Sequence, residues 1–246
     1  KLLKNHSIKI KNIIDNITES DGIIFIYSEY IYAGALPMGI ALEHKGYNKY
    51  GGKNLLNKIS NGKEGNYIIL SADKDISTNN DEEIKLVTSP GNKDGNIIKV
   101  IIGSSITGEG MDFKNIRQIH VLDPWWHLSK LEQIIGRGIR YCSHIDLEEN
   151  KRNVTVFLHT ATYNGNETVD HNNYRRGEKK SMEIGKVETI LKESAYDCYL
   201  FKDANIIEGN KLKVDVKVSR KGIRNFKKNI SDKPYTKICS YQLECD

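Results

Sequence analysis

Paired cysteines and long apolar runs are both missing from this sequence. The four cysteines, at positions 142, 198, 239 and 245, form no CxxC pair, so neither a disulfide framework nor a standard zinc motif is expected. Two incomplete sets of zinc ligands stay open: Cys142 with His144, and Cys239 with Cys245 plus ligands from elsewhere. No apolar leader or membrane-length run occurs, so we expect no membrane partner and a reducing, intracellular location.

The sequence also lacks the two motifs that hold a nucleoside triphosphate and its magnesium ion. No stretch fits the phosphate loop GxxxxGK[ST], whose backbone amides, lysine and hydroxyl contact the phosphates and Mg²⁺. Asp81-Glu82-Glu83 follows polar residues rather than an apolar strand, so it indicates a helix N-terminus favoured by the dipole. A complete ATP site on this chain alone is therefore excluded.

Positive charge is concentrated near the C-terminus. The whole chain carries a formal charge of +5, yet residues 211–237 hold ten Lys or Arg against Asp215 and Asp232. Such a segment suits phosphate backbones. A merely solvated basic strand and tail is the alternative.

Short apolar runs alternate with helical periodicity over the first 160 residues. Strands are predicted at residues 23–27, 67–70, 97–102, 116–122 and 154–158, and helices at 10–17, 29–44 and 127–140. Apolar strands separated by helices predict an α/β fold with a parallel sheet covered on both faces. Ligands are expected beyond the carboxyl ends of its strands.

The pattern changes near residue 165. Residues 160–180 are polar and are predicted to be a loop, residues 184–198 have the spacing of an amphipathic helix, and residues 211–218 alternate as a half-exposed strand. We therefore expect two parts: a lobe at residues 1–165, and a helical and basic extension with some β-structure at residues 166–246.

The strongest local motif is QIIGRGIR at residues 133–140. Arg137 and Arg140, three residues apart, are predicted to lie on one side of a helix and to point at one polyanion. Guanidinium groups fork onto phosphate oxygens and neutralise the charge that develops during phosphoryl transfer. Ordinary surface arginines remain the alternative for this motif taken alone.

A second motif, GSSITGEGMD at residues 103–112, directly follows a predicted strand. Its small residues let backbone amides approach a phosphate, and the hydroxyls of Ser104, Ser105 and Thr107 add donors. The terminal Asp112 suits a ribose hydroxyl. Taken alone, such a loop is more often just a turn.

The order and spacing of these motifs resemble superfamily 2 helicases over about residues 20–160. Residues 103–112 look like their motif V, residues 133–140 like motif VI, and Phe25 to Ser28 like motif IV. The resemblance implies the second, C-terminal RecA-like lobe of such a motor. Its partners would be DNA or RNA and the N-terminal RecA-like lobe, which would bind ATP and supply the ligands of Mg²⁺.

Three stretches, at residues 98–104, 116–126 and 135–144, resemble a narrower group, the helicase-like ATPases of nucleocytoplasmic large DNA viruses. These include the poxvirus-type early transcription factor and the transcription-termination phosphohydrolase. The helix ending at residues 191–198 extends the likeness to about residue 200. This resemblance implies viral transcription or replication, a viral transcription complex as a partner, and the host cytoplasm or virion as the location.

Motif position implies a role for each matching residue. Arg137 and Arg140 would contact the γ-phosphate of ATP, and Gln133 would couple nucleotide to nucleic acid. Gly110, Asp112 and Gly136 would lie near the nucleotide, and Ser104, Ser105 and Thr107 near a nucleic-acid phosphate. Glu109 stands where many relatives have arginine, which leaves its role open.

Trp125 and Trp126, just past a predicted strand, have two possible roles. They suit stacking on bases, and packing in the core or against a partner lobe is the alternative. Because the phosphate loop is missing, we expect the chain alone neither to hydrolyse ATP nor to unwind a duplex. A non-catalytic module that binds nucleic acid or a transcription complex is the competing function.

Overall fold

The computed structural model describes residues 2–56, 63–77, 79–105, 111–196, 214–219, 222–226 and 240–241. The chain divides into two compact units, Lys1–Arg175 and Arg176–Asp246. The boundary expected near residue 165 stays a prediction.

Six parallel strands form the sheet of the first unit, in the order β2-β3-β4-β1-β5-β6. The strands are β1 (Ile23–Tyr27), β2 (Asn48–Lys49), β3 (Asn66–Leu70), β4 (Val100–Gly103), β5 (Ile116–Val121) and β6 (Thr155–Leu158). The central strands β1, β3 and β4 are almost continuously buried, as expected of a sheet covered on both faces. This confirms the predicted α/β fold.

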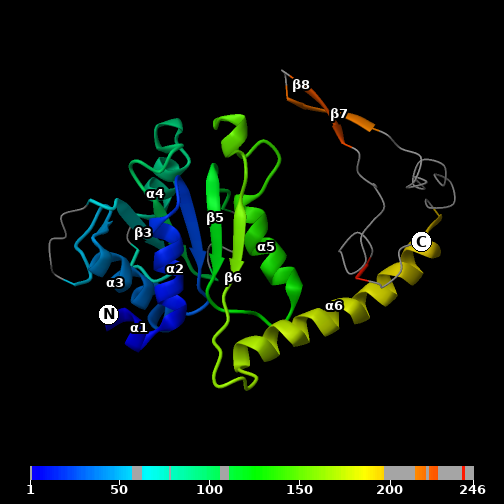
Figure 1. Ribbon diagram of the computed structural model, residues 1–246, viewed down its shortest axis with the longest axis horizontal. Coiled ribbons are helices and arrows are strands. Elements are labelled where there is room, and N and C mark those ends of the chain that lie inside the picture. Colours follow the sequence, from blue (N-terminus) through cyan, green and yellow to red (C-terminus); the bar gives the residue numbers. More distant parts are fainter. Residues whose placement is uncertain are drawn as a thin grey trace. The chain divides into compact units, whose positions relative to one another are not determined.

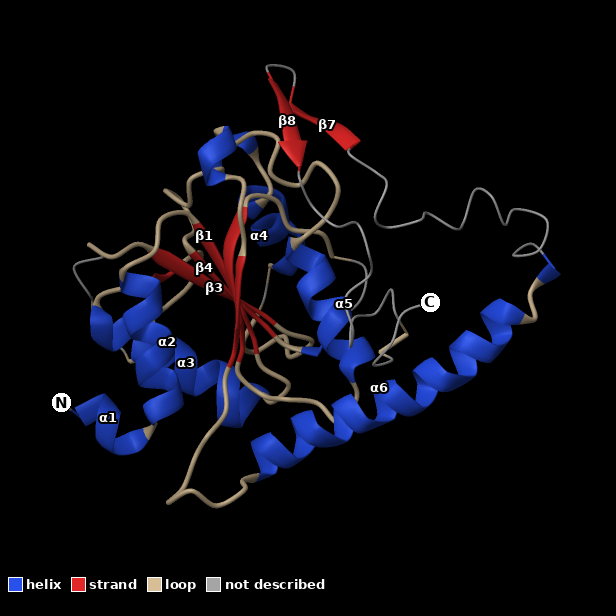
Figure 2. Ribbon diagram, turned by 45° about the vertical axis from the view of Figure 1, so that its right-hand side comes forward, coloured by secondary structure: helices blue, strands red, loops and turns tan. Residues whose placement is uncertain are grey.

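Helices cover both faces of the sheet (Figures 1 and 2). The first unit contains α1 (Leu2–His6), α2 (Ile8–Thr18), the π-helix η1 (Ile31–Ala35), α3 (Leu36–Lys45), α4 (Asn80–Val87), the 3-10 turns η2 (Pro90–Asn92) and η4 (Glu149–Lys151), α5 (Leu128–Gly138) and the start of α6 (Val169–Glu193). The four buried isoleucines of α2 pack with Ile24 and Ile26 of β1 on one face. Ile134 of α5 and Val87 of α4 pack with Phe25 on the other.

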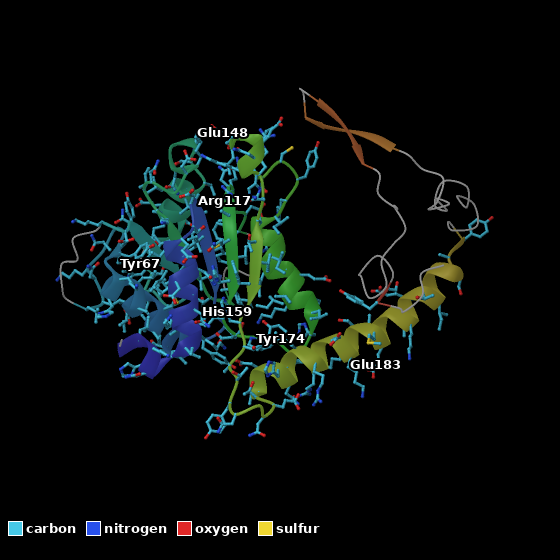
Figure 3. The ribbon with its side chains drawn as sticks, in the orientation of Figure 1. Tyr67, Arg117, Glu148, His159, Tyr174 and Glu183 are labelled. Carbon is cyan, nitrogen blue, oxygen red and sulfur yellow. The ribbon has the colours of Figure 1, made fainter. Side chains whose placement is uncertain are left out.

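Glu43 is a buried carboxylate that ties the segment after β2 to the sheet. It accepts hydrogen bonds from the amides of Leu55 at 2.7 Å and Leu56 at 2.8 Å. It also accepts one from the Tyr67 hydroxyl at 2.7 Å (Figure 3). Three donors compensate for the burial of this charge.

Helix α6 begins at Val169, so the predicted loop at residues 160–180 is confirmed for residues 160–168 and wrong for residues 169–180. Its first turn is anchored to the sheet unit, because Asp170 pairs with Lys9 at 2.8 Å and accepts from the amide of Ala161 at 2.7 Å. Lys, Arg and Glu favour helix without any apolar stripe, so apolar periodicity did not reveal this part of the helix.

The second unit contains the rest of α6 and an antiparallel hairpin, β7 (Val214–Ser219) and β8 (Gly222–Phe226). The predicted alternating strand at residues 211–218 corresponds to β7 within the described residues. None of the described helices is both long and apolar enough to cross a bilayer.

Candidate functional site

Arg137 and Arg140 converge on one carboxylate, that of Asp112. Nη1 of Arg140 donates to Oδ2 of Asp112 at 2.7 Å, and Nη1 of Arg137 lies 3.8 Å from Oδ1. Arg137 also donates to the carbonyl of Met111 at 3.4 Å. The Arg137 side chain is 14% exposed, whereas those of Arg140 and Asp112 are about half exposed. We call these three residues the arginine cluster.

One helix does not carry both arginines, so that prediction is wrong. Helix α5 ends at Gly138, and Ile139 is extended. A Cβ added to Gly138 would lie 3.0 Å from Cδ1 of Ile119, so the helix end packs tightly on β5. Arg140 returns toward the helix by donating from Nε to the carbonyl of Gly136 at 3.2 Å.

The arginine cluster lies at the amino end of β5. The amide of Phe113, three residues before that strand, donates to the carbonyl of Arg137 at 3.0 Å. The amide of Asn115 donates to the carbonyl of Ser143 at 2.9 Å. Helix α5 runs back across the sheet between two parallel strands, which brings its C-terminus to this edge. Ligands were expected beyond the carboxyl ends of the strands, so the arginine cluster lies at the opposite edge of the sheet from the expected site.

Gln133 and Gly136 lie on open parts of α5. Gln133 is exposed, and a Cβ on Gly136 would have no neighbour within 4 Å. Both positions are therefore accessible from outside the chain, next to the arginine cluster in sequence.

The carboxyl edge of the sheet carries the second group of predicted residues. Ser104 is buried, and its Oγ donates to the carbonyl of Leu70 at 3.2 Å. Ser105 is exposed. Thr107, Glu109 and Gly110 lie outside the described residues, and so does the course of the loop between Ser105 and Met111.

The two tryptophans beyond β5 differ in their surroundings. The indole N–H of Trp125 donates to Nε2 of His127 at 2.8 Å, and the Lys130 ammonium lies 3.9 Å from the ring centroid. Contacts within the chain therefore hold Trp125, as in its packing alternative. Trp126 is 40% exposed and is the more accessible of the two rings.

A polar network that sequence inspection missed joins the ends of β1 and β5. Asp123 accepts from the Ser28 hydroxyl at 2.6 Å and from the Glu29 amide at 3.1 Å. Glu29 in turn pairs with Lys130 of α5 at 2.6 Å and accepts from the Tyr27 hydroxyl. Burial, followed by the bond to Glu29, raises the pKa of Tyr27. An acidic residue two positions beyond the end of β1 and of β5 was the available sequence signal.

The backbone of Gly34 packs directly against Ser28 and Asp123 of this network. A Cβ there would lie 1.8 Å from the Ser28 hydroxyl and 3.3 Å from Oδ2 of Asp123, so only glycine fits. The network fixes the start of α5 to the central strand, and the other end of α5 bears Arg137.

The geometry does not support a zinc site at Cys142 and His144. The ring nitrogens of His144 lie 2.8 Å from the Ser143 hydroxyl and 2.6 Å from the Ile116 carbonyl, so contacts within the chain use both. Cys239 and Cys245 lie outside the described residues.

Two guanidinium groups beside a partly exposed carboxylate can receive a polyphosphate. A phosphate, like a carboxylate, can accept two hydrogen bonds from a guanidinium fork, so it could compete with Asp112 for Arg140. Apart from the Asp112 carboxylate, the cluster offers only cationic donors, which suits charge stabilisation.

Comparison with known proteins decides the family. The family described as "Helicase conserved C-terminal domain" matches residues 9–142, more than half of the chain. The chain belongs to this helicase C-terminal domain family. The match contains the sheet through β5, the two serines and the arginine cluster.

Viral proteins are among the most similar relatives of this helicase C-terminal domain. Protein R563 of Acanthamoeba polyphaga mimivirus, named as an ATP-dependent RNA helicase, is 32% identical over 84% of this chain and 35% of its own length. Helicase 087L of Invertebrate iridescent virus 3 is 32% identical over 85% of this chain and 22% of its own length. A "Termination factor NPH-I homolog" of African swine fever virus (isolate Tick/Malawi/Lil 20-1/1983) is 27% identical over 79% of this chain and 33% of its own length.

The chain thus spans about a third or less of these relatives. Among solved structures, the C-terminal part of the Fun30 ATPase domain matches 67% of this chain and 41% of that chain, with 12% identity and a TM-score of 0.43. That likeness is too low to bear on function.

Proposed function

We propose that this chain is the second motor lobe of an ATP-dependent superfamily 2 helicase or translocase acting on DNA or RNA. Convergence of Arg137 and Arg140 on Asp112 is the observation on which the proposal depends. It brings two guanidinium groups to one place, where a partner lobe would present the γ-phosphate of ATP. Names of the viral relatives favour RNA as the track and viral transcription as the setting, in the host cytoplasm or the virion.

Each residue then has a task when the lobes close. Arg140 exchanges Asp112 for a phosphate oxygen, and the more buried Arg137 supplies a second donor. Asp112, once released, can accept from a ribose hydroxyl together with Gly110. Gln133 couples this site to nucleic acid, and Gly136 leaves room for the nucleotide. ATP supplies the binding energy that shifts the open and closed populations, and ligands for Mg²⁺ belong to the other lobe.

The decisive experiment joins the chain in cis to a lobe carrying a phosphate loop and an acidic magnesium motif. Arg137→Ala and Arg140→Ala should each lower nucleic-acid-stimulated kcat about a thousandfold or more, roughly 4 kcal/mol of barrier, because arginine fingers stabilise the developing charge to that extent. Steady-state ATP turnover measures the effect.

Arg175→Ala is the matched control. Arg175 is 66% exposed and pairs with Glu167 rather than with the arginine cluster, so its loss should leave kcat unchanged. ATP turnover by the 246-residue chain alone, abolished by Arg137→Ala, would contradict a two-lobe site. A two-lobe protein that binds nucleic acid without hydrolysing ATP would instead support the non-catalytic binding module.

A further inference from the structure

Two exposed tyrosines lie on the carboxyl edge and have no task in the function proposed above. Tyr30 is 57% exposed and Tyr32 is 72% exposed. Both follow β1, which lies between β4 and β5 in the sheet. They therefore emerge between the two serines after β4 and the two tryptophans after β5.

Tyr32 is anchored although it is exposed. Its hydroxyl donates to Oδ2 of Asp73 at 2.7 Å. Asp73 is itself positioned, because its amide donates to the Ser71 hydroxyl at 3.2 Å and its other carboxylate oxygen accepts from the Asp75 amide at 3.0 Å. An aromatic ring fixed at both ends loses little conformational freedom when a ligand packs on it.

The hydrogen bond between Tyr32 and Asp73 crosses the end of β4. Asp73 follows β3, and β4 lies between β3 and β1. Tyr27, Gly103 and Leu70 are in register across these three strands, so the segments beyond them leave the sheet side by side. The Tyr32 side chain joins the segment after β1 to the segment after β3. It therefore lies near Ser104 and Ser105, which follow β4 between them.

The backbone after β1 supports this placement. The carbonyl of Tyr30 accepts from the amides of Gly34 at 3.0 Å and Ala35 at 2.9 Å. Two amide donors on one carbonyl fix the turn that presents both rings.

We infer that Tyr30 and Tyr32 form a stacking platform for the bases of a single-stranded nucleic acid. The inference rests on the proposed function and deepens it. Aromatic rings accept any base, because every base has a π-face. Trp126, at the end of the neighbouring β5, extends the set of exposed rings along the same edge.

Charge determines which part of the strand faces Tyr32. Asp73 and Asp75 lie beside its hydroxyl, and they repel phosphates. A cavity of about 820 Å³ beyond them is lined by both signs of charge, with Lys74 and Lys85 against Asp81 and Glu82, so it does not favour an anion. Bases therefore face Tyr32, and phosphates face Ser105.

The experiment compares two ligands of equal length, a mixed-sequence single strand and an abasic sugar-phosphate strand, by fluorescence anisotropy on the 246-residue chain. Tyr32→Ala should weaken binding of the base-containing strand about tenfold, the effect of losing one stacked base. Binding of the abasic strand should not change. Tyr32→Phe keeps the ring and should retain most of the affinity.

Tyr141→Ala is the matched control, because Tyr141 is 98% exposed and lies next to Arg140, at the edge of the sheet opposite to Tyr32. Thermal unfolding should be unchanged in all three variants. Equal losses on both strands after Tyr32→Ala, or no loss on either, would overturn the stacking platform while leaving the motor proposal standing. If the unmodified chain binds neither strand, the proposed nucleic-acid function fails and the platform fails with it.

Discussion

Single carboxylates organise both ends of this lobe. Asp112 gathers two arginines at the amino end of β5, and Asp123 joins β1 to β5 at the carboxyl end. Exposed ion pairs contribute little to folding, about 0–1 kcal/mol. The half-exposed pair of Asp112 with Arg140 therefore matters for placing charge more than for stability.

Two neighbouring histidines, His120 and His159, make the stability of the fold depend on pH. Nδ1 of His120, on β5, lies 3.0 Å from Nε2 of His159, just after β6 (Figure 3), and the Phe157 ring stacks on His120 at 4.7 Å. Burial lowers the pKa of His120 to about 3. Burial, followed by the charge of Lys9, lowers the pKa of His159 to about 4. Both rings are neutral at pH 7.

The free energy of unfolding should fall as pH drops below about 6.5, the pKa of histidine in an unfolded chain. There the unfolded state takes up protons that the folded state refuses until about pH 4, so the folded state loses stability across this window. His120 alone should cost about 1–2 kcal/mol at pH 5. Urea unfolding at pH 7.5 and pH 5.0 measures the loss.

His120→Gln removes one titrating ring and can keep a polar contact with His159. The difference in unfolding free energy between the two pH values should then be smaller than in the unmodified chain. An identical pH dependence in both proteins would show that the pair does not remain neutral in the folded state.

At the scale of elements, α5 links the two edges of the sheet. Its first turn is held by Lys130 bound to Glu29, and its end packs on β5 at Gly138. One helix of eleven residues therefore connects the carboxyl edge to Arg137.

Two glycines near the end of α5 give a matched pair of substitutions. Gly138→Ala should lower the unfolding free energy by about 1–3 kcal/mol, because the new Cβ would crowd Ile119 at 3.0 Å and Ile116 at 3.3 Å. Gly136→Ala meets nothing within 4 Å and should raise it by up to about 1 kcal/mol, since alanine favours helix. Urea unfolding of both variants checks this. Equal destabilisation by the two would contradict the packing of the helix end.

At the scale of the whole molecule, the carboxyl edge and the arginine cluster lie at opposite ends of β5. In the function that we propose, the carboxyl edge holds the nucleic acid and the arginine cluster meets ATP on another lobe. Closure of the two lobes would then couple these surfaces.

The basic segment at residues 211–237 is a second predicted contact for the backbone of a nucleic acid. Apart from β7 and β8, it lies outside the described residues. If it binds the backbone of a nucleic acid, deleting it should weaken binding. The slope of log affinity against log salt should also become shallower, by about 0.7 for each phosphate of a single strand that the segment had neutralised. Anisotropy titrations at several salt concentrations measure both. If neither changes, the segment is only solvated.

The sequence by itself determined the fold class and the order of the motifs. Apolar runs such as residues 23–27 and the compact stretch at residues 133–140 carry their meaning within a few neighbouring positions, because strand burial and helix spacing are local properties. The polar start of α6 gave no such signal.

Only the tertiary structure decided which residues meet. Asp112 reaches Arg140 across 28 positions and Tyr32 reaches Asp73 across 41, and the order of the strands makes both pairings possible. Local periodicity contains no information about that order. The separation of the arginines from the carboxyl edge, the different exposure of Trp125 and Trp126, and the anchoring of Tyr32 all follow from the packing of elements that are distant in the chain.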